Sequence, residues 1–363
     1  MKIIQLIQRP QARGVELFTA MLSEELQRLG HVVILISIFE GDYCLPFSGK
    51  QIHLKRLIKK RFFDMKAWKE FSRIVKNESP DIIQANAADT LKFSVFSKKI
   101  FGWNTPILFR NASQISFYIN SPWVKFFNNY LYKNIAGVIS VSNKSKEDFQ
   151  SLFNFSKAHQ VIPIGIRIPT NQTHLESVDY PLLVHIGGFS YEKNHLDLID
   201  IFSNIHSQIP ELKLWLIGEG ALKEEIKEKV KKFSLKDSVI FKGAIPNPFE
   251  IIPRNAIFVL PSKIEGLPAV ILEAFAYKIP VIAYNVGGIP EVLINEKTGY
   301  LIPKSDQMAF KDKIIQILQK DIEDLNPMLN SAFEVYRNSF KIEAVSKSFE
   351  KFYKMILSCK TDK

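Results

Sequence analysis

The amino-acid sequence predicts an α/β protein of two domains, each built on an open parallel sheet with helices on both faces. Three observations support this prediction. The chain of 363 residues is long for a single hydrophobic core. Short β-branched runs alternate with amphipathic helical stretches along it. The alternation stops at the polar, proline-containing stretch 165–181 and then restarts.

The same observations set the expected domain boundaries. The N-terminal domain covers residues 1–168, a linker covers 169–180, and the C-terminal domain covers 181–340. The last helical stretch, 341–363, is expected to pack back on the N-terminal domain. In open parallel sheets ligands bind beyond the carboxyl ends of the strands, so we expect a binding site between the two domains.

The N-terminal half begins with a strand over 2–8. The helix after Gly14 has apolar residues at three- and four-residue spacing, and Gly30 is its expected end. Five further short strands, separated by helical stretches, are predicted at 32–39, 81–85, 106–110, 137–142 and 160–164.

The C-terminal half repeats this pattern. Its predicted strands are 182–188, 213–220, 239–243, 256–262, 280–288 and 299–303. Its predicted helices lie near 194–207, before about 233, from Pro268 to 277, and at roughly 305–320, 327–338 and 341–357.

Composition excludes several classes of protein. Cys44 and Cys359 are the only cysteines, which argues against a disulfide framework or a thiolate metal cluster and favours a reducing compartment. The apolar start of the chain is too short for a signal peptide, and no apolar run approaches the roughly 18 residues of a membrane-spanning helix. The expected location is the cytoplasm.

The net charge of +11 is unevenly distributed. Residues 1–168 hold 24 Lys/Arg against 12 Asp/Glu, whereas residues 169–363 hold 24 against 25. Any acidic partner should therefore meet the first half. No nucleic-acid-binding module accompanies this charge, so we expect no nucleic-acid partner.

Much of this charge lies in the segment 55–76, which has nine Lys/Arg interleaved with Phe62, Phe63, Trp68 and Phe71. The segment 121–133 adds further aromatic residues. Two interpretations fit. A helix with cations on one side and aromatics on the other lies on the anionic inner face of a membrane. Alternatively, the helix packs its aromatics on the sheet and exposes its lysines to solvent.

The stretch "EGLPAVILEA" (265–274) contains the strongest chemical signal. Pro268 suits the first turn of a helix, which places Glu265 in the preceding loop. The free amides of Ala269 and Val270 then lie at the positive end of the helix dipole, where phosphate binds readily.

Glu273 lies within the same helix among apolar residues. A buried carboxylate without partners costs several kcal/mol, and the two vicinal hydroxyls of a ribose would satisfy it. The alternative is that Glu273 lies on a solvated helix face and Glu265 is a simple loop charge, since most glutamates are exposed.

Six segments resemble, in order, the signatures of one large enzyme family. They are "ARGVELFTAML" (12–22), "ISVSNKSKEDF" (139–149), "VHIGGFSYEKNHLDLIDIF" (184–202), "LIGEGALKEEI" (216–226), "VIFKGAI" (239–245) and "PSKIEGLPAVILEAFAYKIPVIAYNVGGIPEVLINEKTGYLI" (261–302). The family is the retaining GT-B glycosyltransferases, the "glycosyl transferases group 1". The resemblance implies the GT-B fold, in which two Rossmann-like domains face a central cleft.

The resemblance also implies roles for individual residues. Glu273 would hold the nucleotide ribose, and Glu265 would contact hydroxyls of the donor sugar. Lys193 would neutralise the diphosphate leaving group, and Gly14 would let the first loop approach the donor phosphates. The segment that meets the distal phosphate and the sugar would consist of Gly266, Leu267, Pro268, Ala269 and Val270.

The sequence departs from the family in three places. Arg13 replaces the first glycine of the first loop. Many family members have an arginine where this chain has Gly188, and Arg13 is a candidate to supply that missing charge. The histidines that the family frequently has after the third and fourth predicted strands are absent, and these positions read Gln84, Asn86 and "RNAS" (110–113). Arg110 and Asn111 are candidates for acceptor binding or sugar positioning, and both fit equally well as strand-end residues that pair with the backbone.

No metal or cofactor is expected. His185 and His195 have no second ligand at metal spacing, and the chain contains no Asp-x-Asp. The stretch "GEGALK" (218–223) lacks the third glycine of a dinucleotide fingerprint.

The resemblance implies a hexosyltransferase that takes its sugar from a nucleotide-diphosphate donor, with UDP-sugar preferred. The acceptor would be a glycan or a lipid-linked glycan of cell-surface polysaccharide synthesis. The C-terminal domain would bind the donor and the basic N-terminal domain the acceptor. Two alternatives remain: a non-catalytic GT-B protein that binds a nucleotide-sugar or a partner, and a sugar-nucleotide epimerase, which the stretch 265–274 disfavours.

Overall fold

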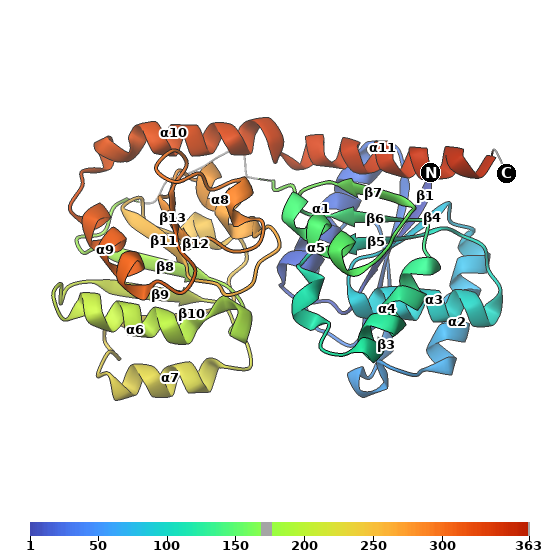
Figure 1. Cartoon of the computed structure of the whole chain (residues 1–363), viewed down its shortest axis with the longest axis horizontal. Coiled ribbons are helices and arrows are strands. Elements are labelled where there is room, and N and C mark those ends of the chain that lie inside the picture. The colour runs from blue at the N-terminus through green and yellow to red at the C-terminus, as the bar shows by residue number, and fades with distance from the viewer. Residues whose placement is uncertain (168–175, 362–363) are drawn as a thin grey trace. The chain divides into compact units, whose positions relative to one another are not determined.

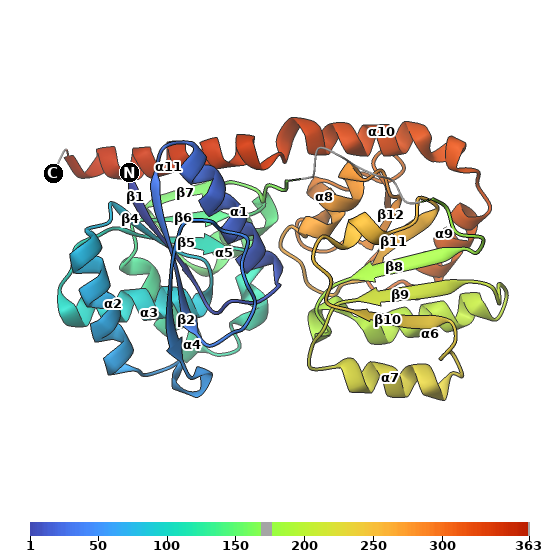
Figure 2. The same ribbon diagram turned by 180° about the vertical axis from the view of Figure 1, so that it is seen from behind.

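The computed structural model describes residues 1–167 and 176–361 and divides the chain into two compact units (Figures 1 and 2). Unit 1 consists of Met1–Arg167 and Lys341–Lys363, and unit 2 consists of Ile168–Phe340. The expected linker, 169–180, lies mostly outside the described residues. No helix in the described ranges is both long and apolar enough to span a membrane.

Unit 1 is built on a seven-stranded parallel sheet with strand order β3-β2-β1-β4-β5-β6-β7. The strands are β1 (Lys2–Ile7), β2 (Val32–Phe39), β3 (Lys50–Arg56), β4 (Ile82–Ala85), β5 (Ile107–Asn111), β6 (Gly137–Ser140) and β7 (Ala158–Val161). Most of them are buried on both faces, as the β-branched runs require.

Helices cover both faces of this sheet (Figure 1). The main helices are α1 (Gly14–Arg28), α2 (Met65–Glu78), α3 (Ala88–Phe101), α4 (Pro122–Lys133), α5 (Asn143–Leu152) and α11 (Ile342–Thr361), and the short turns are η1 (Ile58–Lys60) and η2 (Ile115–Tyr118). Helices α1 and α11 pack together, and α2, α3 and α4 follow one another on the other face. The chain first runs from β1 outward to β3 and then continues from β4 to β7 in the opposite direction across the sheet. Right-handed crossovers therefore place α1 on one face of the sheet and α2, α3 and α4 on the other.

The C-terminal helix contributes to the core of unit 1. The ring of Phe349 lies 5.9 Å from that of Phe18 in α1, and the amide of Ile342 donates to the carbonyl of Ile166. The chain thus enters unit 2 after Arg167 and returns to unit 1 at Lys341.

The segment 55–76 is not a single helix, contrary to the sequence-based expectation. Its first residues end β3, an edge strand that the pattern did not reveal because its residues are polar and largely exposed. Helix α2 begins only after Asp64, whose carboxylate accepts from the amide of Ala67 at 3.0 Å. Trp68 and Phe71 are buried against the sheet, whereas Phe62 and Phe63 are exposed.

Unit 2 is built on a six-stranded parallel sheet with strand order β10-β9-β8-β11-β12-β13. The strands are β8 (Leu182–Ile186), β9 (Lys213–Ile217), β10 (Val239–Gly243), β11 (Ala256–Leu260), β12 (Val281–Tyr284) and β13 (Tyr300–Ile302). The two parallel sheets confirm the predicted fold class.

Two helical layers cover this second sheet (Figure 1). Its helices are α6 (His195–His206), α7 (Lys223–Lys232), α8 (Ala269–Ala276), α9 (Gln307–Leu318) and α10 (Ile322–Ser339), and its short turns are η3 (Tyr191–Lys193), η4 (Pro248–Ile251) and η5 (Ile289–Glu291). Helix α6 packs against α7 and α9, and α8 packs against α10.

Helix α10 begins five residues earlier than the predicted start at residue 327. Pro327 marks a boundary in the sequence but lies inside the helix. A proline removes one backbone hydrogen bond from a helix. Leu325 continues the apolar period of Leu329 upstream of the proline, and both are buried, so packing maintains the extra turn.

Candidate functional site

The two residues with predicted catalytic roles form an ion pair in unit 2. The Nζ atom of Lys193 lies 2.6 Å from Oε1 of Glu265, although the residues are 72 positions apart. Lys193 ends η3, in the loop that leaves β8, and Glu265 lies in the loop that leaves β11. The side chain of Glu265 is only 8% exposed, so the pair is shielded on the carboxylate side. Two neighbouring carboxyl strand ends thus supply one cation and one carboxylate.

Backbone contacts hold these two loops together. The amide of Lys263 donates to the carbonyl of Glu192 at 2.8 Å, and the side chain of Asn194 donates to the carbonyl of Pro261 at 3.0 Å. Asn194 has a left-handed backbone (φ 58°), which asparagine tolerates better than most residues. The positions of Lys193 and Glu265 are therefore determined by the loops and do not depend on their ion pair alone.

A third loop, after β12, supports the backbone of Glu265. The amide of Gly288 donates to the carbonyl of Gly266 at 2.6 Å. Gly287 has φ 57°, and a Cβ atom there would overlap the carbonyl oxygen of Glu265. Both glycines lie in the stretch 261–302 that resembles the family, but the resemblance predicted no role for them. The signal was a glycine pair directly after a buried strand.

A fourth loop, after β9, packs on the loop that carries Lys193. Gly218 has φ 147°, and a Cβ atom there would overlap the carbonyl oxygen of Gly187. The amide of Phe189 donates to the carbonyl of Glu219 at 3.0 Å. The stretch "GEGALK", which does not fit a dinucleotide fingerprint, thus serves as a close-packed support for the β8 loop.

Helix α8 begins at Ala269, one residue later than predicted. Pro268 is its N-cap, with an extended backbone (φ −74°, ψ 122°), and no side chain caps the helix start. Gly266, Leu267 and Pro268 are buried, whereas Ala269 and Val270 are partly exposed. Among the described residues the first-turn amides therefore have no side-chain acceptor, and they are suited to an anion.

Glu273 lies in the second turn of α8. Its carboxylate makes no hydrogen bond or ion pair with the residues that the structure describes, and burial raises its pKa to about 7. Glu273 is partly exposed rather than open to solvent, which argues against the simple surface interpretation.

His185 and His195 form a buried pair beneath the β8 loop. Their ring centroids are 4.5 Å apart, and Nδ1 of His185 lies 2.8 Å from the carbonyl oxygen of Val259. Burial lowers the pKa of His185 to about 4 and that of His195 still further, so both rings are neutral. Within the described ranges no three His, Cys, Asp or Glu side chains are grouped as metal ligands.

The first-loop candidates lie at the start of α1 in unit 1. Arg13 is the exposed N-cap of this helix, and its side chain makes no capping bond. Gly14 is also exposed, and a Cβ atom there would meet nothing within 4 Å. Nothing in the described fold therefore requires glycine at position 14.

Arg110 and Asn111 lie at the carboxyl end of β5. The guanidinium of Arg110 is buried 4.2 Å from the ring centroid of Phe18, and its Nε and Nη1 atoms have no partner among the described residues. Burial lowers the pKa of Arg110 to about 9, so it stays cationic near neutral pH. The amide of Asn111 instead donates to Ser140 Oγ and to the carbonyl of Ser145.

A closed ring of hydrogen bonds occupies the position at which the family often has a histidine. Tyr353 donates to Gln84, Gln84 donates to Asn86, Asn86 donates to Gln5, and Gln5 donates back to Tyr353, at 2.6–3.1 Å. All four residues are buried. The ring joins the C-terminal helix to β1 and β4, a relation that no local sequence pattern contains.

Comparisons with known proteins identify the family of the chain. The family profile "Glycosyl transferases group 1" matches residues 168–334, and the profile "Glycosyltransferase Family 4" matches residues 12–168. Together the two profiles cover most of the chain.

Two curated relatives show the extent of the similarity. The N-acetyl-alpha-D-glucosaminyl L-malate synthase of Bacillus anthracis is 31% identical over 219 residues, which is 59% of this chain and 55% of the synthase. The chain thus spans about half the length of that relative. The amylovoran biosynthesis glycosyltransferase AmsD of Erwinia amylovora is 24% identical over 313 residues, which is 85% of this chain and 87% of AmsD.

Solved structures show the same fold. Sucrose-phosphate synthase from Thermosynechococcus elongatus superposes with a TM-score of 0.81 at 21% identity, covering 99% of each chain. HepE of Anabaena, in complex with UDP and glucose, also has a TM-score of 0.81, at 15% identity, covering 98% of this chain and 100% of HepE.

Proposed function

The chain belongs to the glycosyl transferases group 1 family, and we propose that it is a retaining enzyme that transfers a sugar from a UDP-sugar to a glycan or lipid-linked glycan. The proposed pathway is the synthesis of a cell-surface polysaccharide. Unit 2 would bind the donor, and unit 1 would bind the acceptor.

The observation that carries the proposal is the Lys193–Glu265 ion pair in the loops that leave β8 and β11. Breaking a sugar–phosphate bond places negative charge on the departing diphosphate. A lysine and oriented amides lower the barrier because they stabilise that growing charge. Lys193 and the uncapped first turn of α8 supply both kinds of group.

The two glutamates would hold the two sugars of the donor. Glu273, without a protein partner in the described residues, would accept from the ribose hydroxyls. Glu265, held by Lys193 and by the Gly266–Gly288 hydrogen bond, would accept from hydroxyls of the transferred sugar. In this arrangement Lys193 serves both the leaving group and the orientation of Glu265.

Two findings support the choice of donor and pathway. HepE, with the same fold, is described in complex with UDP-glucose, and AmsD is named for amylovoran biosynthesis. The charge of the described units supports the choice of acceptor side, because unit 2 holds 18 Lys/Arg against 22 Asp/Glu whereas the rest of the chain holds 30 against 15.

One observation favours a non-catalytic alternative. The position of the family histidine is occupied by Gln84 and Asn86, whose side chains are already used in the closed hydrogen-bond ring. A protein that only binds nucleotide-sugar would keep the donor contacts and lack turnover.

The deciding experiment measures binding and turnover separately. Thermal shifts with UDP-, GDP- and ADP-sugars identify the donor, since a ligand at 100 times its Kd stabilises the protein by about 2.7 kcal/mol. NMR of the sugar released by slow donor hydrolysis then reports its anomeric configuration. We expect a UDP-sugar to bind and the released sugar to keep the donor configuration. Binding without release would establish the non-catalytic alternative, and inversion would contradict the retaining mechanism.

A further inference from the structure

Helix α4 of unit 1 has an exposed aromatic face. Trp123, Phe126, Phe127 and Tyr130 recur at the three- and four-residue spacing with which helices bury a face. Here their exposed fractions are 81%, 70%, 39% and 40%. Contiguous apolar residues exposed in this way mark an interaction surface rather than a core.

The segment around η1 continues this surface. Ile58, Phe62 and Phe63 are 53%, 68% and 68% exposed. A chain of ring contacts joins the two segments: Phe63 with Trp68 at 5.2 Å and Trp68 with Phe96 at 5.3 Å. Phe96 in turn contacts Phe127 at 6.0 Å and Tyr130 at 6.5 Å. We call the exposed members of both segments the aromatic surface: Ile58, Phe62, Phe63, Trp123, Phe126, Phe127 and Tyr130.

Exposed lysines flank the aromatic surface. Lys59 and Lys60 lie in η1, and Lys125 and Lys133 lie in α4. None of the four has a carboxylate partner among the described residues, whereas the neighbouring Arg61 faces Asp89 at 3.8 Å. These four cations are available to an external anion.

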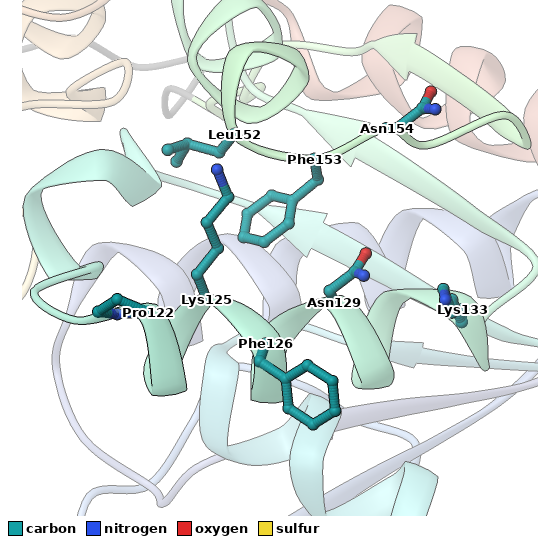
Figure 3. A pocket seen from close by; sticks show the side chains of 8 residues that line it. All are labelled: Pro122, Lys125, Phe126, Asn129, Lys133, Leu152, Phe153 and Asn154. Atoms are coloured by element: carbon teal, nitrogen blue, oxygen red, sulfur yellow. The ribbon is translucent and has the colours of Figure 1, made fainter.

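A pocket of about 490 Å³ lies beside α4 (Figure 3). Lys125, Asn129 and Lys133 line it from one helix, and Phe126 lines it as well. The figure shows the amine of Lys125 reaching toward Leu152 and Phe153. The pocket thus combines two cations and an amide donor with apolar walls, which suits a phosphate group attached to an apolar body.

We propose that unit 1 docks on an anionic membrane through the aromatic surface, with the four lysines against lipid headgroups and a lipid phosphate in the α4 pocket. Rings that enter the headgroup layer between snorkelling lysines are the expected chemistry of such an interface. A surface spread over two segments and rimmed by unpaired cations fits a lipid sheet better than a groove-bound peptide. The proposal does not depend on the transfer reaction.

The surface differs from the one that segment 55–76 suggested. Trp68 and Phe71 are buried and belong to the core, as the structural interpretation of that segment expected. The exposed residues of the segment lie before α2, and most of the aromatic surface comes from α4.

The four tryptophans of the chain make a direct test possible. Trp68, Trp103 and Trp215 are 4%, 5% and 8% exposed, so Trp123 is the one that a membrane can reach. With vesicles of phosphatidylcholine plus phosphatidylglycerol, we expect flotation of the protein and a blue shift of its emission. Trp123→Phe should lose the shift and keep the flotation. Vesicles of phosphatidylcholine alone should bind weakly, and salt should weaken binding to the anionic vesicles.

Matched variants separate this surface from general charge attraction. Lys59→Glu with Lys60→Glu, or Lys125→Glu with Lys133→Glu, should each lower vesicle binding by at least about 30-fold, since one lysine near an anionic surface contributes roughly 5-fold. Lys231→Glu with Lys232→Glu, exposed lysines of α7, is the control with the same charge change and should keep binding. Trp123→Ala with Phe126→Ala should lose the binding that remains at high salt.

Circular dichroism and urea unfolding check that each variant is folded, and because neither uses nucleotide-sugar, this test is separate from that of the proposed function. The proposal is overturned if the wild type does not bind anionic vesicles at low salt, or if it binds without an emission shift. Equal losses in the α7 control would show unspecific attraction and would overturn it as well. Binding of a protein through the aromatic surface, without binding of vesicles, would also overturn the proposal.

Discussion

Glu273→Gln is the sharpest test of the donor site because the change keeps the shape of the side chain and removes its charge. Burial raises the pKa of Glu273 from 4.5 to about 7. The folded protein therefore holds a proton on Glu273 that the unfolded chain releases above pH 4.5. Stability should fall as the pH rises from about 4.5 to 7, because the unfolded state binds fewer protons in that window.

The size of this effect follows from the shift. A difference of about 2.5 pKa units corresponds to roughly 3 kcal/mol of stability lost by pH 8. Glu273→Gln should remove that loss, so the variant should be more stable than the wild type at pH 8 and similar at pH 4.5. Urea unfolding at several pH values measures this, and Glu228→Gln, an exposed glutamate of α7, is the matched control.

UDP binding should change in the opposite direction. The ionised carboxylate accepts from both ribose hydroxyls, and hydrogen bonds to a charged group contribute about 1.5–3 kcal/mol. At pH 8 the variant should bind UDP about 10- to 150-fold more weakly, and the wild type should bind more tightly as the pH rises through 7. Calorimetry that finds equal UDP affinity in the stabilised variant at pH 8 would refute the ribose role of Glu273.

Three further changes test the site and its supports. Lys193→Ala should lower donor turnover by about 100-fold or more and weaken binding of the intact donor less, because the charge on the diphosphate grows as the bond breaks. Steady-state kinetics and calorimetry measure the two effects. A loss of donor affinity with unchanged turnover would contradict the leaving-group role. Gly287→Ala should displace Glu265, whose carbonyl oxygen the new Cβ would overlap, and should lower both the melting temperature and donor hydrolysis, the latter by about 100-fold. Gly14→Ala should leave the melting temperature unchanged because no atom lies within 4 Å of the added Cβ. Equal melting temperatures for the two variants would show that the overlap at Gly287 is relieved elsewhere. Tyr353→Phe should lower stability by about 1–3 kcal/mol in urea unfolding, since the buried Oε1 of Gln84 and Nε2 of Gln5 each lose their partner in the ring. An unchanged midpoint would mean that the hydroxyl of Tyr353 contributes nothing to stability.

The strands were easiest to predict where the sheet is buried on both faces. The largely apolar run 32–39 matches β2 residue for residue, and seven of its eight residues are buried. Burial on both faces requires such runs, and few other structures produce them at this length. Strand β3 was missed because most of its residues are polar and only Leu54 is buried, so it has no apolar run.

The donor site was predictable only in part, for a geometric reason. The stretch 265–274 placed Glu265 in a loop and a helix start beside it, since proline and glycine determine those conformations locally. The contact of Glu265 with Lys193 needs two strand ends brought side by side, and the glycines that hold the loops act through overlaps with distant carbonyl groups. Such steric requirements leave no mark in a single sequence beyond the glycine itself.

Arg110 and Asn111 show what position alone cannot separate. Both end the same strand, and both were equal candidates for the acceptor side. Neighbouring residues of a strand point to opposite faces. Arg110 thus lies against Phe18 of α1, whereas the amide of Asn111 donates to Ser140 Oγ in β6 and to the carbonyl of Ser145 in α5. Arg110 keeps a positive charge and two donor nitrogens without protein partners in the described residues. Of the two, Arg110 is therefore the one with buried donor nitrogens left for a ligand, and it lies beneath α1, the helix that Gly14 begins.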